Sequence, residues 1–102
     1  MTKMLCGYRV LDITQFVAGP TCSRLMAELG ADVIKIELTP TGDHARRSGL
    51  RSRKKEFERC TQSTYFAQHN HSKRSLAINL KSQKGQSLIK KLISKSDVLV
   101  EN

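Results

Sequence analysis

The sequence is poor in several residue types, and each shortage excludes a class of protein. It has no tryptophan, 5% aromatic residues, 2 prolines and 3 cysteines. Because Cys6, Cys22 and Cys60 are odd in number and lack CxxC spacing, a disulfide framework and a zinc knuckle are both disfavoured. No run of about 18 apolar residues is present to span a membrane. The start, MTKMLCGYRV, lacks the apolar segment of a secretory signal, so we expect a cytoplasmic setting.

Acidic residues are also few, at 9 against 18 lysines and arginines, which gives a net charge of +9. A polyanionic partner is therefore expected, and both coenzyme A and nucleic acid are polyanions. The basic segment 46–59 could contact phosphates, but Phe57 is its one aromatic residue and no known nucleic-acid-binding motif surrounds it. The pattern favours a solvated loop, with a small basic nucleic-acid-binding protein as the alternative.

Residues 9–37, RVLDITQFVAGPTCSRLMAELGADVIKIE, have the order strand, loop, helix, strand. Apolar runs at 10–13 and 33–36 predict the two strands. Pro20 suits the first turn of the helix, and Gly30 suits the left-handed residue that ends it. The apolar residues that recur at helical spacing predict its buried face: Cys22, Leu25, Met26 and Leu29.

This order implies a parallel strand pair with a right-handed crossover, because antiparallel neighbours need only a short turn. The predicted fold class is α/β, an incomplete parallel, Rossmann-like sheet with crossover helices. Ligands of such sheets bind beyond the carboxyl ends of the strands, which places the predicted site at residues 14–19. A dinucleotide fingerprint needs three glycines there and Gly19 stands alone, so a structural turn is the alternative.

A second strand-helix-strand unit follows in the C-terminal half. Residues 76–80 predict a third strand, Ser82 a helix N-cap, and residues 97–100 a fourth strand. Two helices for four strands leave apolar sheet surface uncovered. The second helix is predicted to bury Leu88, Ile89, Leu92 and Ile93 and to carry Lys84, Lys90, Lys91 and Lys95 on its remaining surface.

Between the two units, residues 38–62 read as a long basic loop without an apolar period. Asp43 and Arg46 predict a turn with a local ion pair. Beyond the loop, His69 and His71 lie near each other in sequence, but with Cys60 they lack a fourth ligand and a dependable zinc spacing. We therefore expect no metal site and polar surface histidines.

Four motifs in order carry a resemblance to a known family: VLDITQFVAGPTCSRLMAELGADVIKIE, TGDHARR, STYFAQHNHSKRSLAINLKSQKG and SDVLVEN. The sequence resembles the N-terminal portion of the class III CoA-transferases, the CaiB/BaiF type, which includes formyl-CoA transferases and 2-methylacyl-CoA racemases. The resemblance covers most of residues 1–102 and departs from the family mainly at 48–62. It implies a truncated N-terminal part of a large domain, in a family whose members are several times longer and form interlocked homodimers.

The resemblance implies CoA transfer between an acyl-CoA and a carboxylic acid, with coenzyme A as substrate and no permanently bound cofactor. In the family an aspartate carboxylate attacks the thioester and an aspartyl-CoA thioester follows. The aspartate corresponds to a position beyond Asn102, so no aspartate in this sequence is predicted to be catalytic. We expect the 102-residue chain alone to be inactive and not to fold stably.

The family's CoA-binding positions are partly present, and the matching residues are Ala18, Ile78, Asn79, Leu80, Lys81 and Asn102. All follow predicted strands at their carboxyl ends, and Lys81 offers a charge for a phosphate near a helix N-terminus. Val17 and Leu38 stand where formyl-CoA transferases have glutamine and arginine, which argues against formyl or oxalyl chemistry and removes one phosphate contact.

Within the family, the element YF-x-x-x-N-x-x-KRS and the long loop before it resemble the transferases more than the racemases. A 2-methylacyl-CoA racemase is the alternative, and it would move a proton at the carbon next to the thioester. The sequence leaves the acyl donor and the acceptor acid open.

Overall fold

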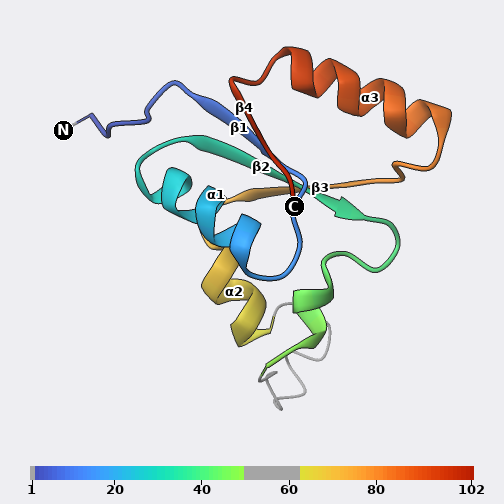
Figure 1. Ribbon diagram of the computed structural model, residues 1–102, viewed down its shortest axis with the longest axis horizontal. Helices are drawn as coiled ribbons and strands as arrows, with labels where there is room; N and C mark the ends of the chain where they lie inside the picture. The colour runs from blue at the N-terminus through green and yellow to red at the C-terminus, as the bar shows by residue number, and fades with distance from the viewer. Residues whose placement is uncertain (1, 50–62) are drawn as a thin grey trace.

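The computed structural model describes residues 2–49 and 63–102. Four parallel strands form one sheet in the order β3-β2-β1-β4, as Figure 1 shows. The predicted α/β class with a parallel sheet is confirmed. The strands are β1 (Arg9–Asp12), β2 (Asp32–Leu38), β3 (Arg74–Ile78) and β4 (Val98–Val100).

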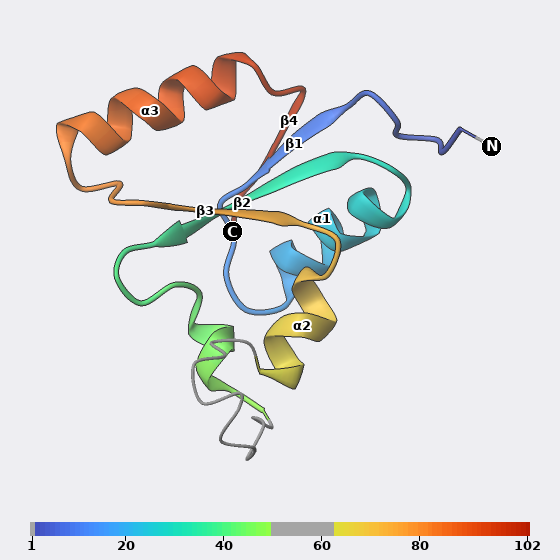
Figure 2. The same cartoon turned by 180° about the vertical axis from the view of Figure 1, so that it is seen from behind.

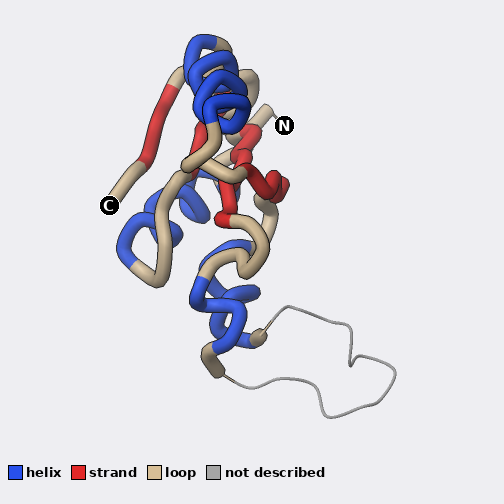
Figure 3. Tube along the Cα trace, turned by 90° about the vertical axis from the view of Figure 1, so that its right-hand side faces the viewer, coloured by secondary structure: helices blue, strands red, loops and turns tan. Residues whose placement is uncertain are grey.

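Helices cover both faces of the sheet. The helix α1 (Ala18–Glu28) connects β1 to β2, and α3 (Gln83–Ser94) connects β3 to β4. Val10 and Val33 pack with Ala27 of α1, whereas Leu11 and Ile34 pack with Ile89 and Leu92 of α3. Neighbouring residues of a strand point to opposite faces, so the two helices lie on opposite sides. Figures 1 and 2 show α3 apart from α1, and the side view in Figure 3 separates them again.

A short helix that the sequence did not predict, α2 (Thr64–Asn70), lies beside α1. The hydroxyl oxygen of Ser63 caps it and accepts from the N–H of Phe66 at 3.1 Å. A helix of 7 residues is too short to leave a periodic apolar pattern. A second short element, the 3-10 helix η1 (His44–Arg47), follows β2 within the long loop. The rest of the predicted basic loop, residues 50–62 with Cys60, lies outside the described residues.

The histidine prediction is wrong for one of the two residues. His69 is buried within α2, and its Nδ1 atom lies 2.8 Å from the carbonyl oxygen of Tyr65. The sequence did not predict α2, and the helix directs this ring inward. His71 is exposed as predicted, with its Nε2 atom 3.1 Å from Glu28.

The buried face of α1 differs from the predicted one. Its buried residues are small: Gly19, Pro20, Ser23 and Ala27. Leu25 and Leu29 are nearly half exposed, Cys22 is exposed, and of the predicted set only Met26 packs against the core. Small side chains let the helix lie close to the sheet, and the Ser23 hydroxyl is buried because it donates to Asp12 at 2.6 Å. The predicted C-terminus is confirmed, since Gly30 has φ +103.

The prediction for α3 is half right. Ile89 and Leu92 pack against the core, whereas Leu88 and Ile93 are 53% and 40% exposed. The predicted N-cap is confirmed because the Ser82 hydroxyl accepts from the N–H of Gly85 at 3.0 Å. No helix within residues 2–49 and 63–102 has the length and apolar character to cross a bilayer.

The start of α3 depends on a glycine that has no room for a side chain. A Cβ atom at Gly85 would lie 1.9 Å from the carbonyl oxygen and 2.7 Å from the carbonyl carbon of Asn79. Because the obstacle is backbone, either the helix or residues 79–82 must move. We expect Gly85→Ala to lower the free energy of unfolding by about 1–3 kcal/mol.

Urea unfolding of the complete gene product measures this change. The control is Ser87→Ala, at an exposed position of the same helix, with an expected change within about 0.5 kcal/mol. Equal stability of Gly85→Ala and the unchanged protein would contradict the prediction.

Candidate functional site

An open cavity of about 430 Å³ lies beyond the carboxyl ends of β1 and β4. Two of the predicted binding residues, Ala18 and Asn102, contribute to its wall although they lie at opposite ends of the sequence. Parallel strands that are neighbours in the sheet bring these ends together. The residues that line the cavity are Ile13, Gln15, Phe16, Val17, Ala18 and Asn102.

Asn102 is held by two hydrogen bonds to the backbone of Gln15. Its Nδ2 atom donates to the Gln15 carbonyl oxygen at 3.0 Å, and its Oδ1 atom accepts from the Gln15 N–H at 3.2 Å. The side chain of Asn102 therefore joins the segment after β4 to the loop after β1.

Residues 78–81 are the remaining predicted binding residues. They lie across Ile13 and Gln15 from the first cavity. Leu80 shares a narrower cavity of about 30 Å³ with these two residues. Lys81 is exposed, and its N–H donates to Asn79 Oδ1 at 3.1 Å. Ile78 is 5% exposed and its side chain belongs to the core, so it has only backbone atoms to offer a ligand.

Asp12, which the sequence analysis did not select for binding, anchors the loop at this site. The carboxylate is fully buried at the end of β1. Its Oδ1 atom accepts from the Thr14 N–H at 2.8 Å and from the Thr14 hydroxyl at 2.5 Å. Its Oδ2 atom accepts from Ser23 at 2.6 Å and from the Lys73 ammonium at 2.9 Å. One side chain thus fixes the loop to α1 and to the segment before β3.

Burial by itself would raise the pKa of Asp12, but the positive charge of Lys35 and the hydrogen bonds from Ser23, Thr14 and Lys73 outweigh it. These partners hold the pKa of Asp12 below its ordinary value. Asp12 is consequently an ionised anchor at neutral pH.

A second buried ionic cluster fixes η1 against β2. The predicted ion pair between Asp43 and Arg46 is absent from the described contacts of these residues, because Arg46 pairs with Glu37 instead. Its Nε and Nη2 atoms donate to the two Glu37 oxygens at 2.7 and 2.6 Å, and Ser75 donates to Glu37 as well. Asp43 pairs with Lys35 at 2.8 Å. The turn itself is confirmed, with Asp43 Oδ1 accepting from the Ala45 N–H at 2.9 Å.

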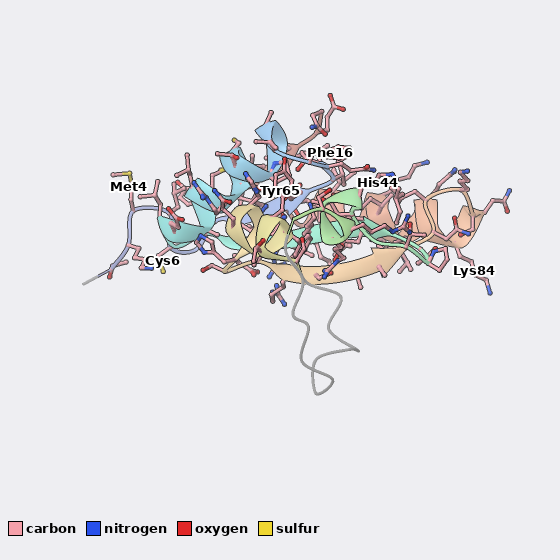
Figure 4. All side chains as sticks on the ribbon, turned by 90° about the horizontal axis from the view of Figure 1, so that it is seen from below. Met4, Cys6, Phe16, His44, Tyr65 and Lys84 are labelled. Carbon is pink, nitrogen blue, oxygen red and sulfur yellow. The ribbon has the colours of Figure 1, made fainter. Side chains whose placement is uncertain are left out.

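Two aromatic rings connect η1 to the cavity. Phe16 and His44 are stacked with centroids 5.8 Å apart and planes 7° apart, and both are labelled in Figure 4. Phe16 has φ +64, a left-handed conformation that is uncommon for a bulky residue. The stack joins the loop after β1 to the element after β2.

The sequence held one signal for these missed residues. Lys35 interrupts the apolar run VIKI of a strand that is buried on both faces. A charge in such a strand must have a buried partner, because an unpaired charge is too costly there. The partners are distant in sequence, so the sequence could not identify them.

Comparison with known proteins places the chain in a family. The model of CoA-transferase family III matches residues 5–102. A formyl-CoA:oxalate CoA-transferase of Bradyrhizobium diazoefficiens is 44% identical over all of this chain and 23% of its own length. Its namesake from Streptomyces avermitilis is 45% identical with the same coverage. The chain thus spans about a quarter of the length of the curated relatives it matches.

Solved structures agree with the sequence comparison. A mutant of Rv3272 from Mycobacterium tuberculosis has a TM-score of 0.83 and 35% identity over 98% of this chain and 25% of its own. A CAIB/BAIF family protein from Brucella suis has a TM-score of 0.82 and 29% identity over 100% of this chain and 26% of its own. With the family model covering residues 5–102, the chain belongs to CoA-transferase family III.

Proposed function

We propose that the complete protein moves CoA from an acyl-CoA to a carboxylic acid. The main support is the cavity at the carboxyl edge of the sheet, which Ala18 and Asn102 both line, while Leu80 lines a smaller cavity that shares Ile13 and Gln15 with it. The resemblance gives Ala18, Asn102 and Leu80 as matches to the family's CoA-contact positions, and family membership supports the class of reaction. Coenzyme A is a substrate in this proposal and is not retained.

The chemical steps need an aspartate outside residues 1–102. Its carboxylate oxygen attacks the thioester carbonyl carbon, and the C–S bond breaks with its electron pair on sulfur, which gives a mixed anhydride and CoA thiolate. The thiolate then attacks the aspartyl carbonyl and releases the donor carboxylate. The acceptor carboxylate then attacks the aspartyl-CoA thioester, which gives a second mixed anhydride and CoA thiolate, and the thiolate attacks the acceptor's acyl carbon and releases the aspartate carboxylate. An activated acyl bond, thioester or anhydride, is therefore present at every stage.

The described residues have the task of holding CoA while this exchange proceeds. Ala18 leaves space beside the loop after β1, and Lys81 offers an ammonium to a phosphate. Asn102 holds the loop backbone in place through Gln15. We infer further that the complete protein forms an interlocked homodimer, as the family does, which light scattering on the purified protein tests.

A substitution at Ala18 tests the binding part of the proposal. We expect Ala18→Leu to weaken CoA binding about tenfold, which is about 1.4 kcal/mol, because the larger side chain fills part of the cavity. Calorimetric titration of the complete gene product with CoA measures this loss. The control is Ala67→Leu, on the exposed side of α2, which should leave the affinity unchanged.

The reaction itself is tested by mass spectrometry of acyl-CoA and acid mixtures with the complete gene product. New acyl-CoA species support transfer, whereas deuterium entry next to an unchanged thioester indicates the racemase alternative. Salt-sensitive DNA binding with no CoA binding would replace the proposal by a nucleic-acid-binding function.

A further inference from the structure

Lys35 is a charged residue at the centre of the sheet. It lies in the middle of β2, between Ile34 and Ile36, and its side chain is 1% exposed. It is among the largest fully buried side chains in residues 2–49 and 63–102. Burying an ammonium requires compensating partners, so the contacts of its Nζ atom reveal its role.

The Nζ atom of Lys35 joins two loops at the carboxyl edge of the sheet. It donates to the carbonyl oxygen of Thr14 at 3.0 Å, in the loop after β1. It also pairs with Asp43 Oδ2 at 2.8 Å, at the start of η1 after β2. Both partners are buried, so neither contact competes with water.

Each of these contacts leads to the cavity wall. Thr14 directly precedes the segment 15–18, which lines the cavity. Asp43 caps η1, and the next residue, His44, stacks on Phe16 from that same wall. Lys35 therefore fixes Thr14, at the start of the loop that lines the cavity. Through Asp43 it also fixes η1, and with it the His44 ring that stacks on Phe16 of that loop.

We propose that Lys35 is a positioning residue that sets the shape of the coenzyme A cavity by joining Thr14 to Asp43. It does not line the cavity and touches no ligand. The proposal rests on the function proposed above only for the identity of the ligand.

The buried position of Lys35 indicates that its role is to fix the loop after β1, and not mainly to stabilise the fold. Replacing a buried ion pair with apolar residues is often neutral or stabilising, so stability alone gives little reason for a lysine in an apolar strand. An apolar residue at position 35 would have no donor for the Thr14 carbonyl oxygen. The hydrogen bond from the ammonium holds the loop in place, and an apolar side chain cannot make it.

Two methionine substitutions in the complete gene product test the proposal. Lys35→Met removes the donor to Thr14. Arg74→Met, the control, removes a cation at the amino edge of the sheet, where its described contacts are with Asp32 and not with the loop 14–18. Lys35→Met should lower the melting temperature, and Arg74→Met should lower it less because its ion pair is exposed. At a temperature where both are folded, Lys35→Met should weaken CoA binding about tenfold and Arg74→Met less than about twofold.

Amide hydrogen exchange gives a readout that does not depend on CoA. Lys35→Met should speed exchange in peptides spanning residues 13–18 and 43–47, whereas Arg74→Met should leave exchange in both segments unchanged. If the unchanged protein does not bind CoA, the proposed ligand is wrong and exchange still decides the role of Lys35. The inference would be wrong if the amides of residues 13–18 exchange as slowly in Lys35→Met as in the unchanged protein.

A double variant separates positioning from charge balance. Lys35→Met with Asp43→Asn removes both charges but leaves an amide oxygen that can accept from the Ala45 N–H. We expect this variant to regain stability relative to Lys35→Met, while CoA affinity stays about tenfold low because Thr14 still lacks its donor. Recovery of full affinity, or retained affinity in Lys35→Met itself, would show that Lys35 only balances charge.

Discussion

Replacing Asp12 with asparagine is expected to cost the protein about 3–5 kcal/mol of folding free energy. The change leaves the Lys73 ammonium, 2% exposed, without the carboxylate that lies 2.9 Å away. It also weakens the charge-assisted bonds from Thr14 and Ser23. Because small proteins are stable by only about 5–15 kcal/mol, a large part of the total would be lost.

The matched control for this change is Asp32→Asn. Asp32 also bonds two cationic side chains, Arg9 and Arg74, but its own side chain is 39% exposed. Exposed ion pairs contribute about 0–1 kcal/mol, so the control should change little. Chemical unfolding of both variants in the complete gene product measures the difference. Equal losses at the two sites would show that burial of the Asp12 network does not determine its strength.

Acid should destabilise the protein through Glu37. Burial alone would raise its pKa, but hydrogen bonds from Arg46, Ser75 and the Asp43 N–H, together with the Arg46 charge, lower the pKa of Glu37 from 4.5 to about 2. A carboxyl group with a lowered pKa in the folded state stabilises it above the unfolded pKa. This contribution is fully present above about pH 4.5 and disappears as the pH falls towards 2. The difference corresponds to about 3 kcal/mol.

Glu37→Gln tests this acid sensitivity. The variant should lose about 3 kcal/mol at pH 7 and show a flatter decline of stability between pH 4.5 and 2, because this carboxyl group no longer takes up a proton. Melting temperatures measured across that pH range provide the test. Glu28→Gln, at a carboxylate whose side chain is 42% exposed, is the control and should keep the original pH profile. A Glu37→Gln profile parallel to that of the unchanged protein would contradict the assignment.

Both predictions concern charged side chains that the fold buries, Asp12 and Glu37. Asp12, Thr14, Ser23 and Lys35 are all fully buried. Buried polar networks of this kind stabilise only when every member has a partner. The network links the ends of β1 and β2 to the loops beyond them, where the proposed site lies.

The sequence by itself determined the four strands and the helices α1 and α3 in their order, but not the short elements η1 and α2. Apolar runs set the parallel strands, while Gly30 and Ser82 marked one helix end and one helix start through local backbone chemistry. It also determined the family, because motifs keep their order and spacing without reference to the fold. The rule that ligands bind at the carboxyl ends of parallel strands placed a site after the first strand, whereas the choice of Ala18 and Asn102 came from the family resemblance; both residues line the cavity there.

Only the tertiary structure decided which side of α1 is buried and which ions pair. Helical spacing fixes the separation of side chains but not which face meets the sheet, so Leu25 was assigned to the core and Ser23 was not. Arg46 was given its neighbour in sequence as partner, whereas the fold provides Glu37. Lys35 meets Thr14 and Asp43 only after the strands align. Burial and pairing depend on contacts between distant residues, and no local pattern records them.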